Sequence, residues 1–353
     1  MGKNILITGA AGYIGGSIVA NFISRIDGPI KSASISAAAR SADQVQTLSK
    51  LGVNAILVDL NDENSVKAAI LSNSIDIIVH TASSSHPSLV ANLINALGER
   101  QKISGETSFV HSSITTLFSV DGGWPHGEIA DTDDVFTKEK ELGGPHPVRQ
   151  TNILLAERAK ALGIKSFNVA VPNVYGRGSG SGRKVSVNIP ANIRAAMEKR
   201  TVYIFDKDGA SPAAHISDLA ELYALLVEKI LLKEPIPSGE KGYYFAMSHQ
   251  TSWWTITKRL AEAMYARGLV DSPEVKTWPS YDEAADALGF PRLHVRAMGT
   301  ASATIAPVNA YKIGWQPKWD EKRFLDNIDE EVRDVLEVDS KPTLFSSMLP
   351  SKN

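Results

Sequence analysis

Short apolar runs rich in β-branched residues alternate with longer amphipathic stretches through the first half of the chain. The apolar runs predict strands at 4–8, 33–37, 55–58, 75–80, 108–112 and 166–171. Helices are expected between them, beginning near Ile14, Ala42, Asn64, Ser88 and Val148. Parallel strands need crossover connections, and these are right-handed in nearly all proteins. The pattern therefore predicts an α/β fold with a Rossmann-type, doubly wound parallel sheet.

The second half of the chain has a different pattern. A glycine-rich segment, GRGSGSGRK, follows Tyr175, and a helix (NIPANIRAAMEKR), a strand (TVYIF) and a long amphipathic helix (ISDLAELYALLVEKIL) come next. Past Pro235 the pattern predicts short helices with scattered Trp and Pro. We expect a Rossmann domain in 1–175 plus about 201–232, the part in which the cofactor motifs described below lie. A smaller, mostly helical lobe, expected to bind the substrate, would take 176–200 and about 233–353.

Composition narrows the class of protein. The chain has 353 residues, 43% of them hydrophobic, and a formal net charge of -2, so no basic face indicates nucleic acid or an anionic membrane as partner. Cysteine is absent, which excludes disulfides and thiolate nucleophiles. The start MGKNILITG enters a strand at once and does not look like a secretory signal. We expect a cytoplasmic protein with a small-molecule substrate, no membrane or nucleic-acid partner and no metal site.

The first strand runs directly into a glycine motif that opens a helix. Glycine in a T-G-x-x-G-x-x-G spacing allows a tight turn and lets the backbone approach a pyrophosphate. The N-terminus of the following helix offers N–H donors and a positive potential. A dinucleotide site is therefore predicted at Gly9, Ala11, Gly12, Tyr13, Ile14 and Gly15.

The end of the second strand distinguishes between the two nicotinamide dinucleotides. An NAD site usually has an acidic residue here for the ribose diol, whereas an NADP site accommodates the 2'-phosphate with a cation. This chain reads SISAAARSADQ, with small residues followed by Arg40 and Ser41. NADP(H) is the expected cofactor, ahead of NAD(H).

With these motifs, and with VDL, HTAS, FVHSS, VPNVYG and HISDLAEL in order, the chain resembles the extended short-chain dehydrogenase/reductases. This group includes the NAD-dependent epimerases and dehydratases. The resemblance implies that Asp59 and Leu60 lie by the adenine. It also implies that Thr81, Ala82 and Ser83 line the centre of the cofactor, and that Pro172, Asn173 and Val174 approach the nicotinamide.

The segment RQTNILLAE departs from the pattern of the family that the chain resembles. Family members carry a catalytic Tyr-x-x-x-Lys on this helix, with a glutamate four residues after the lysine. If Glu157 is that glutamate, the lysine position holds Ile153 and the tyrosine position holds Arg149. A guanidinium can orient a carbonyl or carboxylate but is a poor proton donor. Arg149 is thus either a substrate-orienting group or an exposed residue in a salt bridge.

Other residues must then handle the proton. Ser112 and Ser113, followed by Thr115, match the family's serine or threonine, and Ser113 is the preferred candidate. Histidine titrates near neutral pH, and several histidines fall near the expected cleft: His80, His111, His126, His146 and His215. His146, directly before the altered helix, is preferred among them. The expected catalytic set is Ser113, Arg149 and His146.

The substrate and the reaction type stay open at this point. Nucleotide-sugar members of the family often have an arginine where this chain has Ser211, so a non-nucleotide substrate is favoured. Three functions fit: an atypical NADP-dependent reductase of a carbonyl, enone or imine, an epimerase- or dehydratase-like enzyme using bound cofactor without net redox change, and a catalytically silent NADP-binding regulator. The oligomeric state stays open between a monomer and a homodimer, the latter pairing through the apolar face of the helix ILLAERAKAL.

Overall fold

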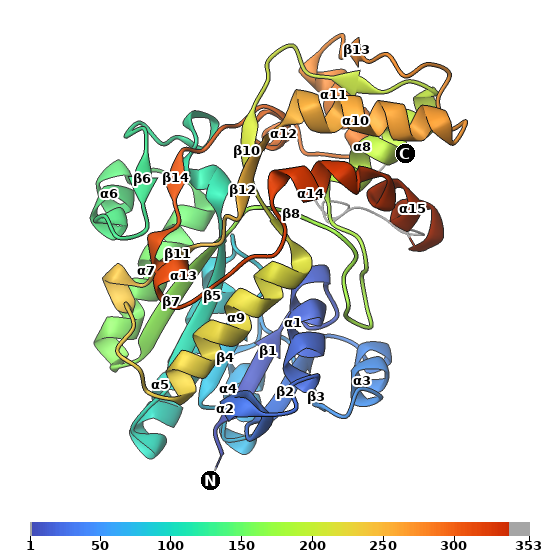
Figure 1. The fold of residues 1–353 in the computed structure, drawn as a ribbon. Helices are drawn as coiled ribbons and strands as arrows, with labels where there is room; N and C mark the ends of the chain where they lie inside the picture. Colours follow the sequence, from blue (N-terminus) through green and yellow to red (C-terminus); the bar gives the residue numbers. More distant parts are fainter. Residues whose placement is uncertain (1, 339–353) are drawn as a thin grey trace.

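The computed structural model describes residues 2–338 and centres on one seven-stranded parallel sheet (Figure 1). Its order is β11-β7-β5-β4-β1-β2-β3, with β1 in the interior. The strands are β1 (Asn4–Thr8), β2 (Ser34–Ala39), β3 (Asn54–Leu57), β4 (Ile77–His80), β5 (Ser108–Ile114), β7 (Lys165–Val171) and β11 (Tyr243–Phe245). The predicted doubly wound α/β fold is confirmed, and six of these strands fall at the predicted runs.

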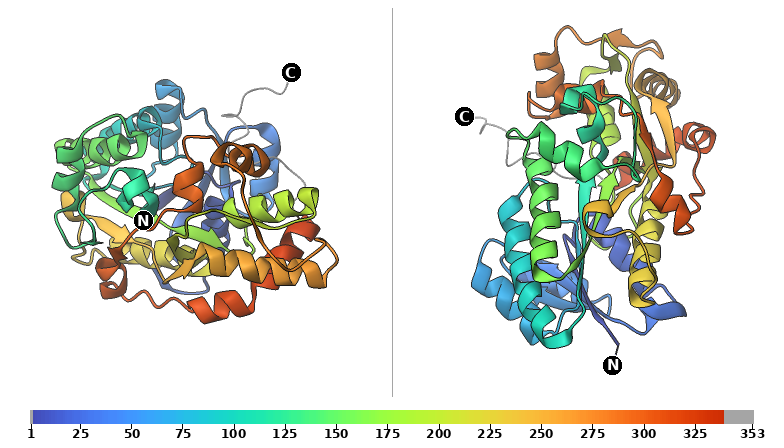
Figure 2. Two further views of the ribbon diagram at one scale, coloured as in Figure 1. Left: turned by 90° about the horizontal axis from the view of Figure 1, so that it is seen from above. Right: turned by 90° about the vertical axis from the view of Figure 1, so that its left-hand side faces the viewer.

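Helices cover both faces of the sheet, giving three layers in the side view (Figure 2). One face carries α1 (Tyr13–Ile23), α2 (Gly28–Lys31), α3 (Ala42–Ser49) and α9 (Ile216–Leu231). The other carries α4 (Glu63–Ser72), α5 (Pro87–Ser104) and α7 (Pro147–Leu162). Because both faces are buried, the central strands are apolar almost throughout.

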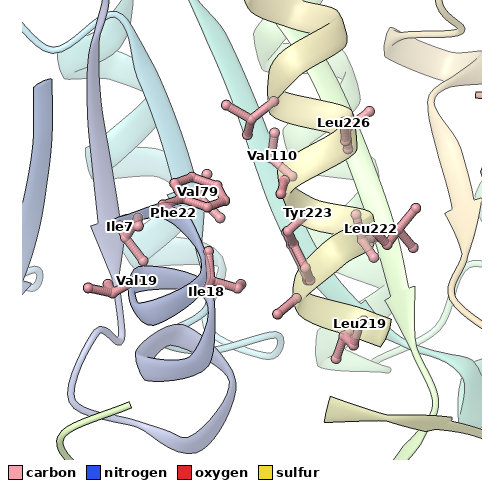
Figure 3. Close-up of a cluster of buried hydrophobic side chains, with 14 of the residues drawn as sticks. Ile7, Ile18, Val19, Phe22, Val79, Val110, Leu219, Leu222, Tyr223 and Leu226 are labelled. Carbon is pink, nitrogen blue, oxygen red and sulfur yellow. The ribbon is translucent and has the colours of Figure 1, made fainter. Parts of the chain in front are cut away.

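The largest core cluster lies between the sheet and the helices α1 and α9 (Figure 3). Ile7, Val79 and Val110 come from three neighbouring strands, while Phe22 and Leu222 come from the two helices. All five side chains are at most 1% exposed. Burying each side chain of this kind contributes about 1.5 to 3 kcal/mol relative to leaving it in water, so this cluster fixes the helices on the sheet.

A mostly helical lobe lies beyond the carboxyl ends of the strands (Figure 1). Its helices are α8 (Asn188–Lys199), α10 (Trp253–Ala266), α11 (Tyr281–Leu288), α12 (Val295–Gly299), α14 (Glu321–Asp326) and α15 (Ile328–Val338). Small sheets join them: β8 (Asn173–Tyr175) with β10 (Ala210–His215) and β12 (His249–Ser252), and β9 (Tyr203–Ile204) with β13 (Lys276–Thr277). Helix α10 begins after Ser252, whose hydroxyl accepts from the Thr255 N–H.

The expected division of the chain changes at two points. Strand β11 lies in the segment assigned to the lobe, yet it forms the seventh strand of the large sheet beside β7. Strand β9 lies in the segment assigned to the Rossmann domain, yet it pairs with β13 in the lobe. The chain thus passes between the two parts more often than local composition indicates, because a local pattern can mark a strand such as TVYIF without showing which sheet it joins.

A buried carboxylate ties the late segments to the sheet. Asp131 follows β6 (Ile129–Ala130) and is 1% exposed. Its Oδ1 accepts from the N–H groups of Val308 (2.9 Å) and Asn309 (2.8 Å), at the start of α13 (Val308–Lys312). Its Oδ2 accepts from the Phe245 N–H in β11 at 3.0 Å. One side chain therefore satisfies backbone donors from two distant segments.

We predict that Asp131→Ala lowers the free energy of unfolding by about 3 kcal/mol, because it leaves buried N–H groups without acceptors. Urea denaturation measures the effect. Asp133→Ala is the matched control, since the exposed Asp133 accepts a single backbone N–H from Ala130. Equal losses in the two variants would contradict the role of Asp131.

Candidate cofactor and active site

The glycine turn after β1 is held against the end of β4. Gly9 has a φ of 70°, and a Cβ on it would lie 2.8 Å from the Thr81 carbonyl and hydroxyl. A Cβ on Gly15 would overlap the Gly9 carbonyl oxygen and the Thr81 hydroxyl. The Thr81 hydroxyl itself donates to the Thr8 carbonyl at 2.7 Å. Helix α1 begins at Tyr13 with no side-chain cap, so its first N–H groups are available to a phosphate.

The glycine-rich segment 176–187 lies directly on this turn. A Cβ on Gly180 would overlap the backbone of Gly16, and one on Gly182 would overlap Ala11. The Tyr13 hydroxyl donates to the Gly176 carbonyl at 2.5 Å, and the Arg183 N–H donates to the Ala11 carbonyl at 3.3 Å. The segment thus covers the start of α1 (Figure 1).

Arg183 brings a cation to the same place. Burial lowers the pKa of its guanidinium, and its Nη2 is buried without a hydrogen-bond partner among residues 2–338. A buried guanidinium donor without an acceptor is costly unless a ligand satisfies it. The turn and Arg183 together therefore fit the pyrophosphate of a dinucleotide.

Arg40 and Ser41 lie where the expected 2'-phosphate contact would be. Arg40 directly follows β2 and is exposed, and its guanidinium has no ion-pair partner within the described part of the chain. Its backbone N–H donates to the Gln44 side chain at 3.0 Å. The Ser41 hydroxyl caps α3 by accepting from the Gln44 N–H. The Arg40 side chain is therefore available to a ligand, whereas Ser41 already has a structural role.

The other predicted cofactor residues follow the carboxyl ends of the strands. Asp59 is exposed after β3 and accepts from Asn61, and the Leu60 carbonyl accepts from Asn92. The Ser83 hydroxyl lies 2.6 Å from His86 Nδ1. Pro172 connects β7 to β8, Asn173 and Val174 begin β8, and the Asn173 Nδ2 is buried without a partner among the described residues. The topology of a parallel sheet brings these loops to one edge.

Arg149 does not lie on the surface in a salt bridge. It is 6% exposed, and its guanidinium donates to the carbonyls of Gly143, Gly122 and Gly123 at 3.3 to 3.4 Å. Burial lowers the pKa of this guanidinium and the carboxyl of Glu139 raises it. Arg149 thus joins two loops at the head of α7.

Ile153, at the expected lysine position, is half-buried and lines an outer groove between α5 and α7 with Gln150 and Leu154. The neighbouring Asn152 faces inward instead and is 1% exposed. Its Nδ2 donates to Glu139 Oε1 at 2.9 Å. Asn152, one position before the expected lysine, therefore presents an amide to the interior.

Ser113 and His146 each have a buried polar atom without a partner in residues 2–338: the Ser113 hydroxyl and the His146 Nδ1. Burial, Arg149 and His294 all lower the pKa of His146. Ser112 differs, because its hydroxyl lies 2.6 Å from the Tyr223 hydroxyl on the opposite face of the sheet. Among the two serines, only Ser113 has a hydroxyl left for another group.

The remaining histidines have structural partners or lie in the sheet. His215 caps α9 and stacks on Trp319, with ring centroids 4.1 Å apart. His126 lies edge-on to Trp124. His80 and His111 are fully buried in β4 and β5, and their rings stack with centroids 5.6 Å apart.

Sequence reasoning did not find Glu139, a buried carboxyl in α6 (Val135–Leu142). Its Oε2 accepts from the Tyr243 hydroxyl at 2.6 Å. Burial raises the pKa of Glu139 to about 7, against the lowering effect of its bonds to Tyr243 and Asn152 and of the Arg149 charge. The segment VFTKEKEL reads as an exposed amphipathic helix, so no local signal marks this residue.

The parallel sheet, the glycine turn and the covering lobe define a Rossmann-type fold with a second lobe at the carboxyl edge of the sheet. Residues 5–110 match the NAD dependent epimerase/dehydratase family. No curated protein matches the chain in sequence.

Solved structures resemble the whole chain in fold. UDP-glucose 4-epimerase from Thermotoga maritima is 18% identical with a TM-score of 0.63, over 95% of this chain and 100% of that one. A dTDP-glucose 4,6-dehydratase from Bacillus anthracis, in complex with NAD, is 15% identical with a TM-score of 0.61, over 94% and 96%. A monomeric L-threonine 3-dehydrogenase from a metagenome is 17% identical with a TM-score of 0.61, over 94% and 100%. At these identities the likeness shows the fold alone.

Two further observations concern residues 2–338. No helix there is long and apolar enough to cross a membrane. No group of three or more His, Asp or Glu there is placed to hold a metal ion.

We predict that Arg149→Lys lowers the free energy of unfolding by about 2 kcal/mol, because an ammonium cannot reach carbonyls in two loops at once. Urea denaturation provides the value. Arg158→Lys, on the same helix, is the control: Arg158 is exposed and bonds only Asn95. If both variants lose the same stability, Arg149 is not what holds the loops.

Proposed function

We propose that this protein is an atypical NADP(H)-dependent oxidoreductase that reduces a carbonyl, enone or imine of a small, non-nucleotide substrate. The observation that carries the proposal is the pairing of the glycine turn with Arg40. The turn fits a dinucleotide phosphate, and the end of β2 offers an exposed guanidinium where NAD-binding members have an acid. The bound cofactor supplies a hydride. The protein must supply position, exclusion of water and a proton.

Side chains at the head of α7 and the end of β5 are the candidates for those tasks. Arg149 is too basic to give up a proton, and its bonds to three carbonyls make it a group that fixes the loops around the substrate. Ser113 has a hydroxyl without a protein partner in the described chain, which can donate a hydrogen bond to a substrate oxygen. Burial lowers the pKa of His146, which favours its neutral ring, so His146 can orient the substrate by a hydrogen bond but is a poor source of the proton.

The substrate class is inferred from the lack of an arginine side chain at position 211. Ser211 lies in β10 at the position where an arginine would bind a sugar diphosphate, and its hydroxyl is 3.3 Å from the Pro212 carbonyl. A serine cannot make the bidentate, charge-assisted contact that an arginine gives a diphosphate. This supports a substrate without a nucleotide moiety.

An epimerase- or dehydratase-like reaction is the second candidate, favoured by the family match over residues 5–110. Such an enzyme would convert its substrate without net loss of NADPH. A silent NADP-binding regulator would bind the cofactor and consume nothing. We further infer a cytoplasmic protein that pairs through the α5 and α7 surface, where Ile153 and Leu154 are only half-buried.

We predict that Arg40→Ala weakens NADPH binding by about 10- to 100-fold and leaves NADH binding unchanged, because only NADPH has the phosphate that pairs with the guanidinium. Isothermal titration with NADPH, NADP, NADH and NAD in parallel measures this. Arg259→Ala, an exposed change on α10, is the control. Equal weakening of NADPH and NADH would contradict the NADP assignment.

We also predict that Ser113→Ala lowers the rate of NADPH oxidation with a carbonyl or imine substrate by about 100-fold while NADPH affinity stays the same. Ser112→Ala, on the opposite face of the same strand, should have the smaller effect. Unchanged turnover in the Ser113 variant would remove this hydroxyl from the mechanism.

A further inference from the structure

A row of polar side chains crosses the interior of the sheet. Thr8 in β1 is the register partner of His80 in β4, and His80 is the partner of His111 in β5. His111 is in turn the partner of Asn168 in β7, and Asn168 is the partner of Tyr243 in β11. Five adjacent strands, seen side by side in Figure 1, thus each contribute one polar residue at the same level.

All five side chains point to the face covered by α5 and α7. On β5 the alternate residue Phe109 packs in the cluster under these helices, and on β4 Ile78 does so. On β7 the flanking Phe167 and Val169 pack on the opposite face, which leaves Asn168 on this one. The five residues are at most 5% exposed. The row is therefore an internal layer between the sheet and α5 and α7.

Direct contacts hold only part of this row. The Thr8 hydroxyl lies 2.8 Å from His80 Nδ1, and the His80 and His111 rings are stacked. Asn168 interacts weakly with the Tyr243 hydroxyl, and His80 with the Ser83 backbone. Polar atoms without a protein partner in residues 2–338 are both ring nitrogens of His111 and Asn152 Oδ1. Buried polar atoms in proteins are almost always hydrogen-bonded, often to internal water. So many in one layer point to a hydrated path.

Glu139 lies at one end of the row. Its carboxyl accepts from Tyr243 and from Asn152, and the charge facing it is the Arg149 guanidinium on α7. The Asp134 carboxyl that caps α6 acts on the Tyr243 hydroxyl and raises its pKa. Because burial raises the pKa of this carboxyl to about 7, it is mostly protonated below neutral pH and mostly ionised above it. Glu139 can therefore hold a proton and release it near neutral pH.

Ser113 lies next to the other part of the row. It is two residues beyond His111 on the same strand and faces the same side, a separation of roughly 7 Å along the strand. One or two water molecules can bridge that separation. The hydroxyl proposed above as the substrate's hydrogen-bond donor thus lies on the hydrated layer.

We propose that this layer is an internal proton path in which Glu139, acting through Tyr243, His111 and water between them, supplies the proton that Ser113 gives to the substrate. The inference rests on the proposed reductase function. The substrate oxygen or nitrogen takes a proton from Ser113, and Ser113 regains one from the adjacent water. Protonated Glu139 donates to the Tyr243 oxygen, the Tyr243 hydroxyl proton passes to water beside Asn168, and His111 accepts at one ring nitrogen and releases from the other. The net change is that Glu139 becomes a carboxylate, which solvent later reprotonates.

The first test follows the histidines rather than activity. The full-length protein, labelled at the histidine ring carbons, is titrated by NMR from about pH 5.5 to about pH 8.5, which covers roughly one and a half pH units on either side of the Glu139 pKa of about 7. Burial lowers the pKa of His80 to about 4, and that of His111 also lies well below its usual value. Neither ring titrates itself near pH 7. We expect His111 to show an inflection there that reports Glu139.

Glu139→Gln and Tyr243→Phe should each abolish that inflection, because the first removes the titrating proton and the second breaks the path. Glu331→Gln is the control for the first, since Glu331 is another buried carboxyl with a pKa raised to about 7 by burial, but on α15 in the lobe. Tyr244→Phe is the control for the second, since the Tyr244 hydroxyl bonds Pro237 on the opposite face. Both controls should keep the inflection. Its absence in the wild type, or its persistence in Glu139→Gln, would overturn the proposal.

The second test measures NADPH oxidation with carbonyl and imine substrates across the same pH range. We expect the wild-type rate to fall as the pH rises through about 7, where Glu139 loses its proton. Glu139→Gln should be slower by about 100-fold and lose this pH dependence, with NADPH affinity unchanged. A wild type that oxidises no NADPH would refute the reductase function, while the histidine titration would still decide the path. A rate and pH profile unchanged in Glu139→Gln would refute the path alone.

Discussion

Contact between backbones at glycine positions is the constraint on which the rest of the structure depends. Gly15 lies against the Gly9 carbonyl and Thr81, so α1, β1 and β4 meet without an intervening side chain. Gly180 and Gly182 bring the segment 176–187 onto α1 and the turn in the same way. A single Cβ at these places would separate the layers by more than packing can absorb. The cofactor edge of the sheet and the lobe that covers it are therefore joined by the same contact.

The buried carboxyl groups of Asp131 and Glu139 have different surroundings and therefore different roles. Asp131 accepts backbone N–H groups from β11 and α13, so its function is to join segments far apart in the chain. Glu139 accepts from the side chains of Tyr243 and Asn152, both part of a polar layer. Burial raises the pKa of both, to about 6 and about 7. A carboxyl that binds backbone is fixed in place, whereas one that binds a hydroxyl can exchange a proton with it.

Helix α7 shows what occupies the positions where the family resemblance led us to expect a catalytic tyrosine and lysine. Arg149 at the expected tyrosine position is buried and joins two loops, and Asn152 rather than Ile153 faces the interior. The head of the helix therefore makes polar contacts with two loops and with α6. Those contacts, together with Ser113 and the buried row behind it, support the proposal that this site is catalytic and has not lost its activity.

The local sequence determined the strands and helices of the sheet, because the repeat of apolar positions and the spacing of glycines are set within a few residues. The predicted strand 4–8, for example, is β1. It also determined the glycine turn and Arg40, whose positions follow directly from strand ends. The tertiary structure alone decided that Tyr243–Phe245 joins the sheet and that Arg149 points into two loops. It alone decided the row from Thr8 to Tyr243 and the burial of Glu139. Strand register and helix packing bring these residues together across long separations in the chain, and no local pattern encodes such separations.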